Sequence, residues 1–230
     1  MSELIHMERQ GAVHVLRMNH GENQVQLGFL EAMHHALDTV EAQPGPAALV
    51  ITGHGKYYST GFDRSALADM ERAADIVERA TQLCARLLAL PLPCCAAING
   101  HAFGIGGMIA LCLDFRVMRE DRGFLCFPEL DLGFPLHPGM FALLKLRIDP
   151  VTLHELMLLG TRVGGTRAHS TRMVDEAVPE ADVLPRAIAR VQGLARHRGE
   201  LLGAYKRNLN AAAIDVIEAP TSFRFPPIPG

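Results

Sequence analysis

The chain has 230 residues, and its 22 lysines and arginines against 25 aspartates and glutamates give a formal net charge of −3. Hydrophobic residues make up 49% of the sequence and charged residues 20%, which excludes a disordered chain. The near-neutral charge argues against broad nucleic-acid binding, because that function needs a basic face. The length predicts one large domain, or one and a half, with ample surface to bury.

The cysteines and the apolar stretches point to a protein without disulfides, metal or membrane span. The cysteine count is five, and no CxxC pair occurs, so neither a disulfide framework nor a zinc site is expected. The first residues, MSELIHMERQ, lack the basic stretch and apolar run of a signal peptide. No apolar stretch reaches the roughly 20 residues of a membrane helix. We expect a cytoplasmic protein.

The first 130 residues predict an alternation of strands and helices. Apolar residues recur at helical spacing in two long segments, and proline-rich turns end both of them. Strands are predicted at Ala12–Met18, Ala48–Thr52, Cys94–Ile98, Asp114–Met118 and Phe124–Phe127, and helices at Leu27–Gln43, Ser65–Leu90 and Gly106–Leu113. Such alternation predicts an α/β body with parallel strand pairing.

The remainder of the chain is predicted to be mainly helical. Pro150–Leu159 has a capping aspartate before it, a proline at its first position and Gly160 after its end. Further helices are predicted at Val183–Arg196 and Glu200–Glu218, before the proline-rich segment Pro220–Gly230. This helical end is either a cap on the α/β body or an oligomerisation surface.

A glycine-rich segment, Gly53–Asp63, follows the buried strand that ends at Thr52. Its sequence, GHGKYYSTGFD, could cradle a phosphate, but a dinucleotide fingerprint needs a glycine where Tyr58 stands. A phosphate-binding loop of the NTPase type needs Ser or Thr after Lys56, and the sequence has Tyr57. The segment is therefore either an ordinary tight turn or a turn with a free backbone N–H near Phe62.

Two further segments contain groups that could bind a ligand or take part in catalysis. Asn99–Gly107, NGHAFGIGG, lies between a strand and an apolar helix, where unpaired N–H groups can hold an anion or a developing oxyanion. Glu129 stands in the largely apolar segment Phe127–Pro135. A carboxyl group held in such surroundings would have a raised pKa and could act as a base near neutral pH; the alternative is a solvated loop glutamate.

The three segments together, in this order and spacing, resemble the crotonase (enoyl-CoA hydratase/isomerase) superfamily. The resemblance runs from about Met7 to Asp175 and is strongest over Leu49–Pro135. Within the superfamily, INGHAFGIGGMIALCLD and VMREDRGFLCFPELDLG are most similar to the plant-type Δ3,Δ2-enoyl-CoA isomerases. The resemblance implies a ββα spiral with two near-perpendicular sheets over residues 1–180, and a C-terminal helical region over 181–230 for a lid and for trimer or hexamer contacts.

The resemblance also implies a site for an acyl-CoA thioester. The backbone N–H groups of Phe62 and Ile105 would hold the enolate oxygen. Hydratases of the superfamily use two glutamates around a water, and here one of those positions is Met108 while the other is Glu129. One glutamate without its partner fits proton shuttling better than water addition. We therefore expect Glu129 to act first as base and then as acid in a Δ3,Δ2-enoyl-CoA isomerase of fatty-acid β-oxidation, which needs no cofactor because coenzyme A is part of the substrate.

Other positions are assigned by the same resemblance. Coenzyme A is expected to contact Lys56, Ser59, Gly61 and Gly104, with Lys206 and Arg207 as weaker candidates for the phosphates. The acyl chain is expected to contact Leu67, Met70, Met108 and Phe134, although core packing explains these residues equally well. Asp63, Asp131 and His137 are polar groups near the expected site, and His137 is a candidate second catalytic group.

Three alternatives to the isomerase stay open at this stage. The first is another crotonase reaction, such as a hydratase or hydrolase of a specialised acyl-CoA. The second is a non-catalytic acyl-CoA-binding paralogue, which would not need Glu129. The third is a nucleotide-binding α/β domain, which the missing third glycine and the missing GK[ST] sequence disfavour.

Overall fold

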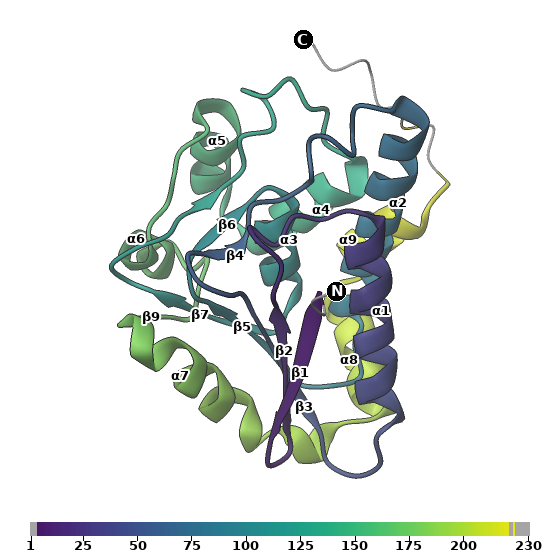
Figure 1. Cartoon of the computed structure of the whole chain (residues 1–230), viewed down its shortest axis with the longest axis vertical. Helices are drawn as coiled ribbons and strands as arrows, with labels where there is room; N and C mark the ends of the chain where they lie inside the picture. Colours follow the sequence, from purple (N-terminus) through teal and green to yellow (C-terminus); the bar gives the residue numbers. More distant parts are fainter. Residues whose placement is uncertain (1–3, 221–222, 224–230) are drawn as a thin grey trace.

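The computed structural model describes residues 4–220 and 223, without the side chains of Met70 and Glu71. Its centre is a six-stranded sheet in the order β1-β2-β3-β5-β7-β9 (Figure 1). β1 is antiparallel to β2, and each of the other neighbouring pairs is parallel. The strands are β1 (Ile5–Gln10), β2 (Val13–Met18), β3 (Ala48–Thr52), β5 (Cys94–Ile98), β7 (Phe115–Arg119) and β9 (Glu176–Val178).

A second, smaller sheet has three parallel strands in the order β4-β6-β8. These strands are β4 (Tyr57–Ser59), β6 (His101–Phe103) and β8 (Leu125–Cys126). Each follows a strand of the large sheet in the chain, so the chain repeatedly passes from the large sheet to the small one. The predicted α/β class with a crotonase-like arrangement of strands and helices is confirmed.

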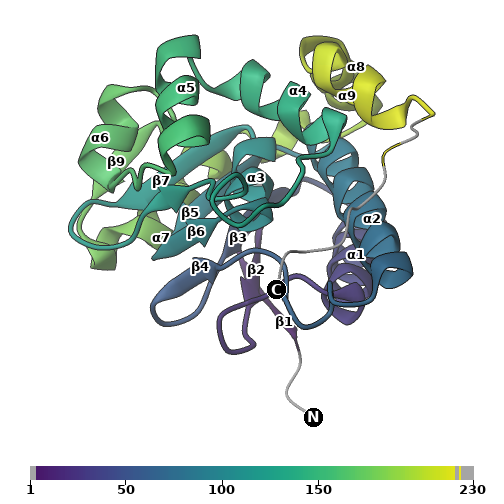
Figure 2. The ribbon, with the colours of Figure 1, turned by 90° about the horizontal axis from the view of Figure 1, so that it is seen from above.

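Helices cover both faces of the large sheet (Figures 1 and 2). The helices are α1 (Leu27–Ala42), α2 (Met70–Leu88), α3 (Ile105–Cys112), α4 (Pro138–Arg147), α5 (Pro150–Leu159), α6 (Gly165–Ser170), α7 (Glu180–Gln192), the 3-10 helix η1 (Ala195–His197), α8 (Glu200–Leu209) and α9 (Ala211–Glu218). Strand β3 contributes side chains to both faces of the sheet, because side chains alternate across a strand. Ala48 and Val50 pack toward α7, while Leu49 and Ile51 join the main core with α1 and α2.

The C-terminal helices pack against the same core as the α/β body. Ile214 and Ile217 of α9 are buried in the main core, and α9 lies against α4 and α2. The helix predicted over Glu200–Glu218 is two helices, because the chain bends at Asn210. The amide of this residue is buried and donates to the backbone oxygen of Leu88. Of the tail predicted at 220–230, only residues 220 and 223 lie within the described part.

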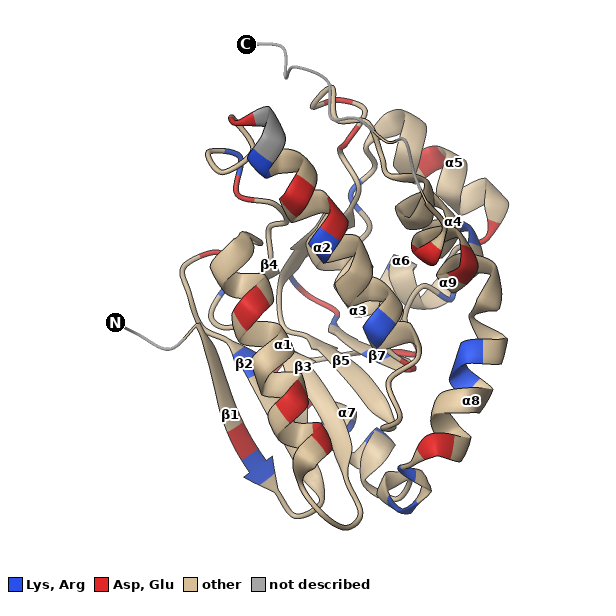
Figure 3. Ribbon diagram, turned by 90° about the vertical axis from the view of Figure 1, so that its right-hand side faces the viewer, with Lys and Arg blue, Asp and Glu red and all other residues tan. Residues whose placement is uncertain are grey.

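On the face shown in Figure 3, the charged residues of α1 are all acidic, whereas α2 and α8 each carry both acidic and basic residues. Arg86 of α2 bonds the carboxylates of Asp38 and Glu41 on α1, each at 2.6 Å, and so ties the two helices together. Over the described residues, no helix combines the length and the apolar character needed to cross a membrane.

Candidate active site

Two glycine-containing loops meet because they follow neighbouring parallel strands. The first loop contains Gly61 and the second contains Gly104. β3 and β5 pair in parallel, and so do β4 and β6. The turns after β3 and β5 are locked by the Asn99 side chain, which accepts from the N–H of Gly53 at 2.9 Å and donates to the oxygen of Gly55 at 3.1 Å. A side chain at Gly100 would lie 2.0 Å from the backbone oxygen of Lys56, so this close approach of the two turns requires glycine.

The first loop presents the N–H of Phe62. Val25 donates to the oxygen of Gly61, and Asp63 donates to the oxygen of Val25. The N–H of Phe62, which lies between these two bonds in the chain, therefore points away from Val25. No hydrogen bond among the described residues uses it. Gly61 has φ +90°, and a Cβ there would lie 2.9 Å from the oxygen of Phe103, which places this loop directly against the second one.

The second loop presents the N–H of Ile105 at the start of α3. Gly104 is the residue before the helix, with φ +50° and ψ −128°, a conformation that glycine adopts readily and other residues do not. The N–H groups of a first helical turn have no acceptor within the helix, and that of Ile105 donates to no group of the described chain. The two loops therefore offer two unbonded N–H groups, one on each side of their contact.

Glu129 lies beside the second loop, in a compact turn after β8. The turn is closed by the N–H of Phe134, which donates to the backbone oxygen of Glu129 at 2.8 Å. A Cβ on Gly104 would lie 3.0 Å from Glu129 Oε1, and Oε2 is buried without a partner in the described structure. Burial raises the pKa of Glu129 from about 4.5 to about 7, so near neutral pH this carboxyl can both accept and return a proton.

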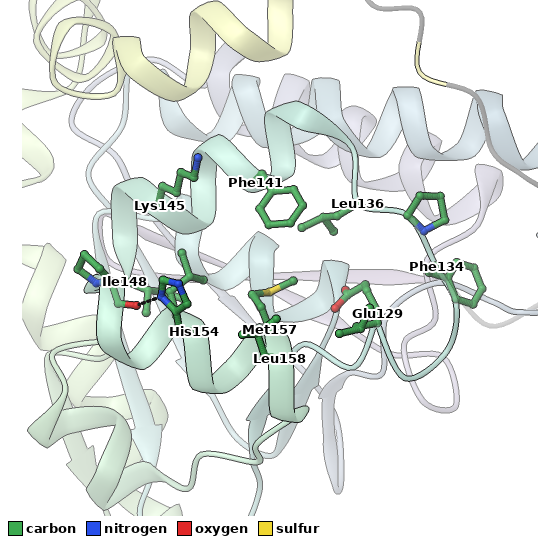
Figure 4. Close-up of a pocket in the computed structure, with 13 residues that line it drawn as sticks. Glu129, Phe134, Leu136, Phe141, Lys145, Ile148, His154, Met157 and Leu158 are labelled. Carbon is green, nitrogen blue, oxygen red and sulfur yellow. Dashed lines mark hydrogen bonds between the residues drawn. The ribbon is translucent and has the colours of Figure 1, made fainter.

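Glu129 and Phe134 lie between two cavities. The smaller cavity, of about 260 Å³, is lined by both glycine loops, including Phe62 and Ile105, and has Glu22 and Arg64 among its lining residues. The larger, of about 700 Å³, lies between the Glu129 turn and helices α4 and α5. In Figure 4 the carboxylate of Glu129 points into this larger cavity, toward Met157. A ligand could thus have a polar head in the first cavity and an apolar tail in the second.

Several residues predicted to contact the ligand lie behind the cavity walls instead. Ser59 is fully buried and organises the first loop, because its hydroxyl donates to the oxygen of Asn23 at 2.7 Å and accepts from the N–H of Gly61 at 3.2 Å. Leu67 and Met108 are packed in the hydrophobic core and line neither cavity. The side chain of Met70 lies outside the described part.

The predicted phosphate-binding cations are not gathered at the site. Lys206 is buried in an ion pair with Asp114 at 2.8 Å and is not available to a phosphate. Arg207 forms an exposed pair with Glu218 at 3.1 Å and lines neither cavity. Lys56 is exposed and lines a separate surface hollow. Arg64 is the basic residue that the structure places in the smaller cavity, and the sequence argument did not select it.

None of the three additional polar candidates lines either cavity. His137 is buried and caps α4, because its Nδ1 accepts from the N–H of Gly139 at 3.1 Å. Asp63 accepts hydrogen bonds from Ser65, and these bonds lower its pKa. Neither residue lines either cavity, and Asp131 does not line them either. Glu129 is thus the buried carboxyl of the site, since Glu22 is exposed.

Residues of α4 and α5 that no sequence motif indicates also line the larger cavity, among them Phe141, Lys145 and Met157. The sequence suggests helices here, but nothing in it shows that these two helices pack beside the Glu129 turn. Contacts between segments this far apart become visible only in the folded chain.

Known proteins match this fold over nearly the whole chain. An enoyl-CoA isomerase of Mycobacterium tuberculosis superposes with a TM-score of 0.88 at 27% identity, covering 94% of this chain and 95% of that one. The human mitochondrial Δ3-Δ2-enoyl-CoA isomerase shares the fold, with a TM-score of 0.85 at 21% identity, covering 92% of this chain and 85% of that one. The two-sheet fold and the paired glycine loops therefore define a crotonase-type protein.

Sequence comparison gives the family. Residues 8–224 match the family Enoyl-CoA hydratase/isomerase. Enoyl-CoA delta isomerase 3 of Arabidopsis thaliana is 32% identical over 71% of this chain and 73% of its own length. The 2,3-dehydroadipyl-CoA hydratase of Escherichia coli is 28% identical over 95% of this chain and 86% of its own length. The chain belongs to the enoyl-CoA hydratase/isomerase family, and its relatives include both isomerases and hydratases.

Proposed function

We propose that this protein converts 3-enoyl-CoA thioesters to trans-2-enoyl-CoA. One observation carries the proposal: a single buried carboxyl, that of Glu129, has a pKa raised to about 7 and lies against the loop that presents the N–H of Ile105. An isomerisation that moves one proton along the chain needs one group able to take it and give it back. A carboxyl that titrates near neutral pH has that property.

The mechanism follows from this arrangement. The thioester oxygen accepts hydrogen bonds from the N–H groups of Phe62 and Ile105. Glu129 removes a proton from C2, and the electron pair moves into an enolate whose charge rests on that oxygen. Glu129 then returns the proton at C4, and the double bond forms between C2 and C3. Each oxyanion donor contributes on the order of 2.7–4 kcal/mol, and the proton transfer about 10²- to 10⁴-fold in rate.

Hydration is less well supported because a second acid–base group is missing from this arrangement. The position at which hydratases of the superfamily carry another glutamate is Met108, whose side chain is fully buried in the core. Glu22 lines the smaller cavity, but it is exposed, and its Oε2 accepts from the hydroxyl of Thr60 at 3.1 Å. With Glu129 as the buried carboxyl, water lacks the second group that would orient and activate it.

The remaining parts of the proposal concern coenzyme A and assembly. Coenzyme A enters as part of the substrate, with its thioester in the smaller cavity near Gly61 and Gly104. We further propose a homotrimer or hexamer in the cytoplasm, acting in fatty-acid breakdown. An exposed apolar stripe on α8, formed by Leu201, Tyr205 and Leu209, supports association, and sedimentation would test it.

Ultraviolet absorbance tests the reaction. The conjugated 2-enoyl thioester absorbs where the 3-enoyl thioester does not, so isomerisation of trans-3-enoyl-CoA produces a rise. A parallel cuvette with a 2-enoyl-CoA reports hydration as a fall. A rise in the first cuvette without a fall in the second supports the isomerase. A fall in the second identifies a hydratase, and coenzyme A binding with no change in either identifies a non-catalytic binder or another acyl-CoA reaction.

A further inference from the structure

The larger cavity has an unequal distribution of polar groups. Ten of its thirteen lining residues are apolar, and the other three are Glu129, Lys145 and His154. Glu129 lies at one end, and the two basic residues lie at the opposite end (Figure 4). A cavity for a plain hydrocarbon tail gains nothing from the cation Lys145 at its far end, whereas an acyl chain ending in an anion would find there a partner of opposite charge.

Lys145 is the group that carries charge at this end. It lies near the end of α4, is exposed, and forms no ion pair or hydrogen bond with the described residues. Lys145 lines the cavity, and in Figure 4 its amine points upward, away from His154 and α5, as long basic side chains commonly do at the rim of an apolar surface. Because the amine is exposed, its attraction to an anion at this end of the cavity is modest and is screened by salt.

His154 comes from the facing helix, α5. Its Nδ1 lies 2.7 Å from the backbone oxygen of Pro150. A carbonyl can only accept, so Nδ1 carries the proton, and Nε2 of this tautomer can only accept a hydrogen bond. Two helices thus each contribute one basic side chain at the same end of the cavity, while Glu129 acts at the other end.

We propose that the larger cavity accepts acyl chains with an anionic far end, such as the ω-carboxylate of a dicarboxylic acyl-CoA, and that Lys145 is the specificity-determining residue that receives it. This inference rests on the proposed function for the position of the thioester, since the thioester carbon chain must leave the smaller cavity past Glu129. The ω-carboxylate remains unchanged in the reaction, and Lys145 acts only in binding.

The test compares two series of 3-enoyl-CoA thioesters of increasing chain length, one ending in a methyl group and one in a carboxylate. The structure predicts that kcat/KM for one length of the ω-carboxyl series exceeds that of the matched methyl substrate. Lys145→Met should lower the ratio of kcat/KM for that ω-carboxyl substrate to kcat/KM for the methyl substrate of the same length about tenfold. Arg196→Met removes an exposed positive charge that lines neither cavity, and it should leave the preference intact.

A binding measurement separates this inference from the proposed reaction. Calorimetric titration with saturated acyl-CoA and saturated ω-carboxyl acyl-CoA of the same length needs no turnover. Tighter binding of the ω-carboxyl ligand that is lost in Lys145→Met and weakened by added salt supports the inference even if isomerisation fails. Equal binding of the two ligands, or a preference that Lys145→Met leaves unchanged, overturns it, while normal turnover of the methyl series would leave the isomerase in place.

Discussion

Replacing Glu129 by glutamine should lower activity and raise stability at the same time. In Glu129→Gln the side chain keeps its size but cannot transfer the proton, so kcat on a 3-enoyl-CoA should fall by about 10³-fold, within the range for general acid–base catalysis. The gain in stability follows from the cost of burying this carboxylate. Its pKa rises from 4.5 to about 7, and each pKa unit corresponds to about 1.4 kcal/mol.

The free-energy cost of burying the Glu129 carboxylate increases with pH. Below about pH 4.5 the carboxyl is protonated in the folded and in the unfolded chain, and the penalty is absent. Between pH 4.5 and 7 the unfolded chain releases the proton first, so wild-type stability falls, and above pH 7 the full cost of about 3 kcal/mol applies. The glutamine amide is also polar and lacks a partner, so the expected gain for Glu129→Gln at pH 8 is about 2 kcal/mol.

Urea unfolding at pH 4.5 and pH 8 measures this difference, together with steady-state turnover at the higher pH. Asp131→Asn is the matched control, because Asp131 is an exposed carboxylate in the same turn and lines neither cavity. The control should change neither turnover nor the pH dependence of stability. Wild-type turnover in Glu129→Gln, or a stability difference that is equal at the two pH values, would refute the reasoning.

Three further predictions follow from the same contacts. As a base, Glu129 must be ionised in the free enzyme, so kcat/KM should rise with pH through about 7, and a flat profile from pH 5 to 9 would contradict this role. Gly104→Ala should lower kcat at least tenfold, because φ is +50° and the new Cβ would press on Oε1 of Glu129. Its control, Gly193→Ala, has open space around the new Cβ and should retain wild-type kcat. Lys206→Met should destabilise the fold by about 2–4 kcal/mol in denaturant unfolding by leaving Asp114 unpaired, and adding Asp114→Asn should recover part of the loss.

The elements that were predictable from sequence are those with strong local signals. β3 at Ala48–Thr52 and β5 at Cys94–Ile98 are uninterrupted apolar runs between turn residues, and both have the predicted bounds. α5 at Pro150–Leu159 also has the predicted bounds, because Asp149 caps it and Gly160 ends it in the left-handed conformation. In each case the local sequence and the tertiary environment favour the same structure.

The elements that were missed are short or depend on distant partners. β6 at His101–Phe103 has three residues, and the sequence predicts a glycine-rich loop there, since the pairing with Tyr57–Ser59 of β4 is not visible locally. For the site, the chain motifs identified Glu129 and the two loop glycines, but not the burial of Ser59 or the pairing of Lys206 with Asp114. Which side chain faces a cavity is decided by packing between distant segments.

If Glu129 removes the C2 proton and returns it at C4, the same hydrogen moves along the acyl chain. Mass spectrometry of a single turnover in ordinary water, with a 3-enoyl-CoA deuterated at C2, detects this transfer. We expect a 2-enoyl-CoA product without added water that carries part of the deuterium at C4, and loss of this transfer in Glu129→Gln. A 3-hydroxyacyl-CoA as the first product, or a 2-enoyl-CoA with no deuterium at C4, would contradict it.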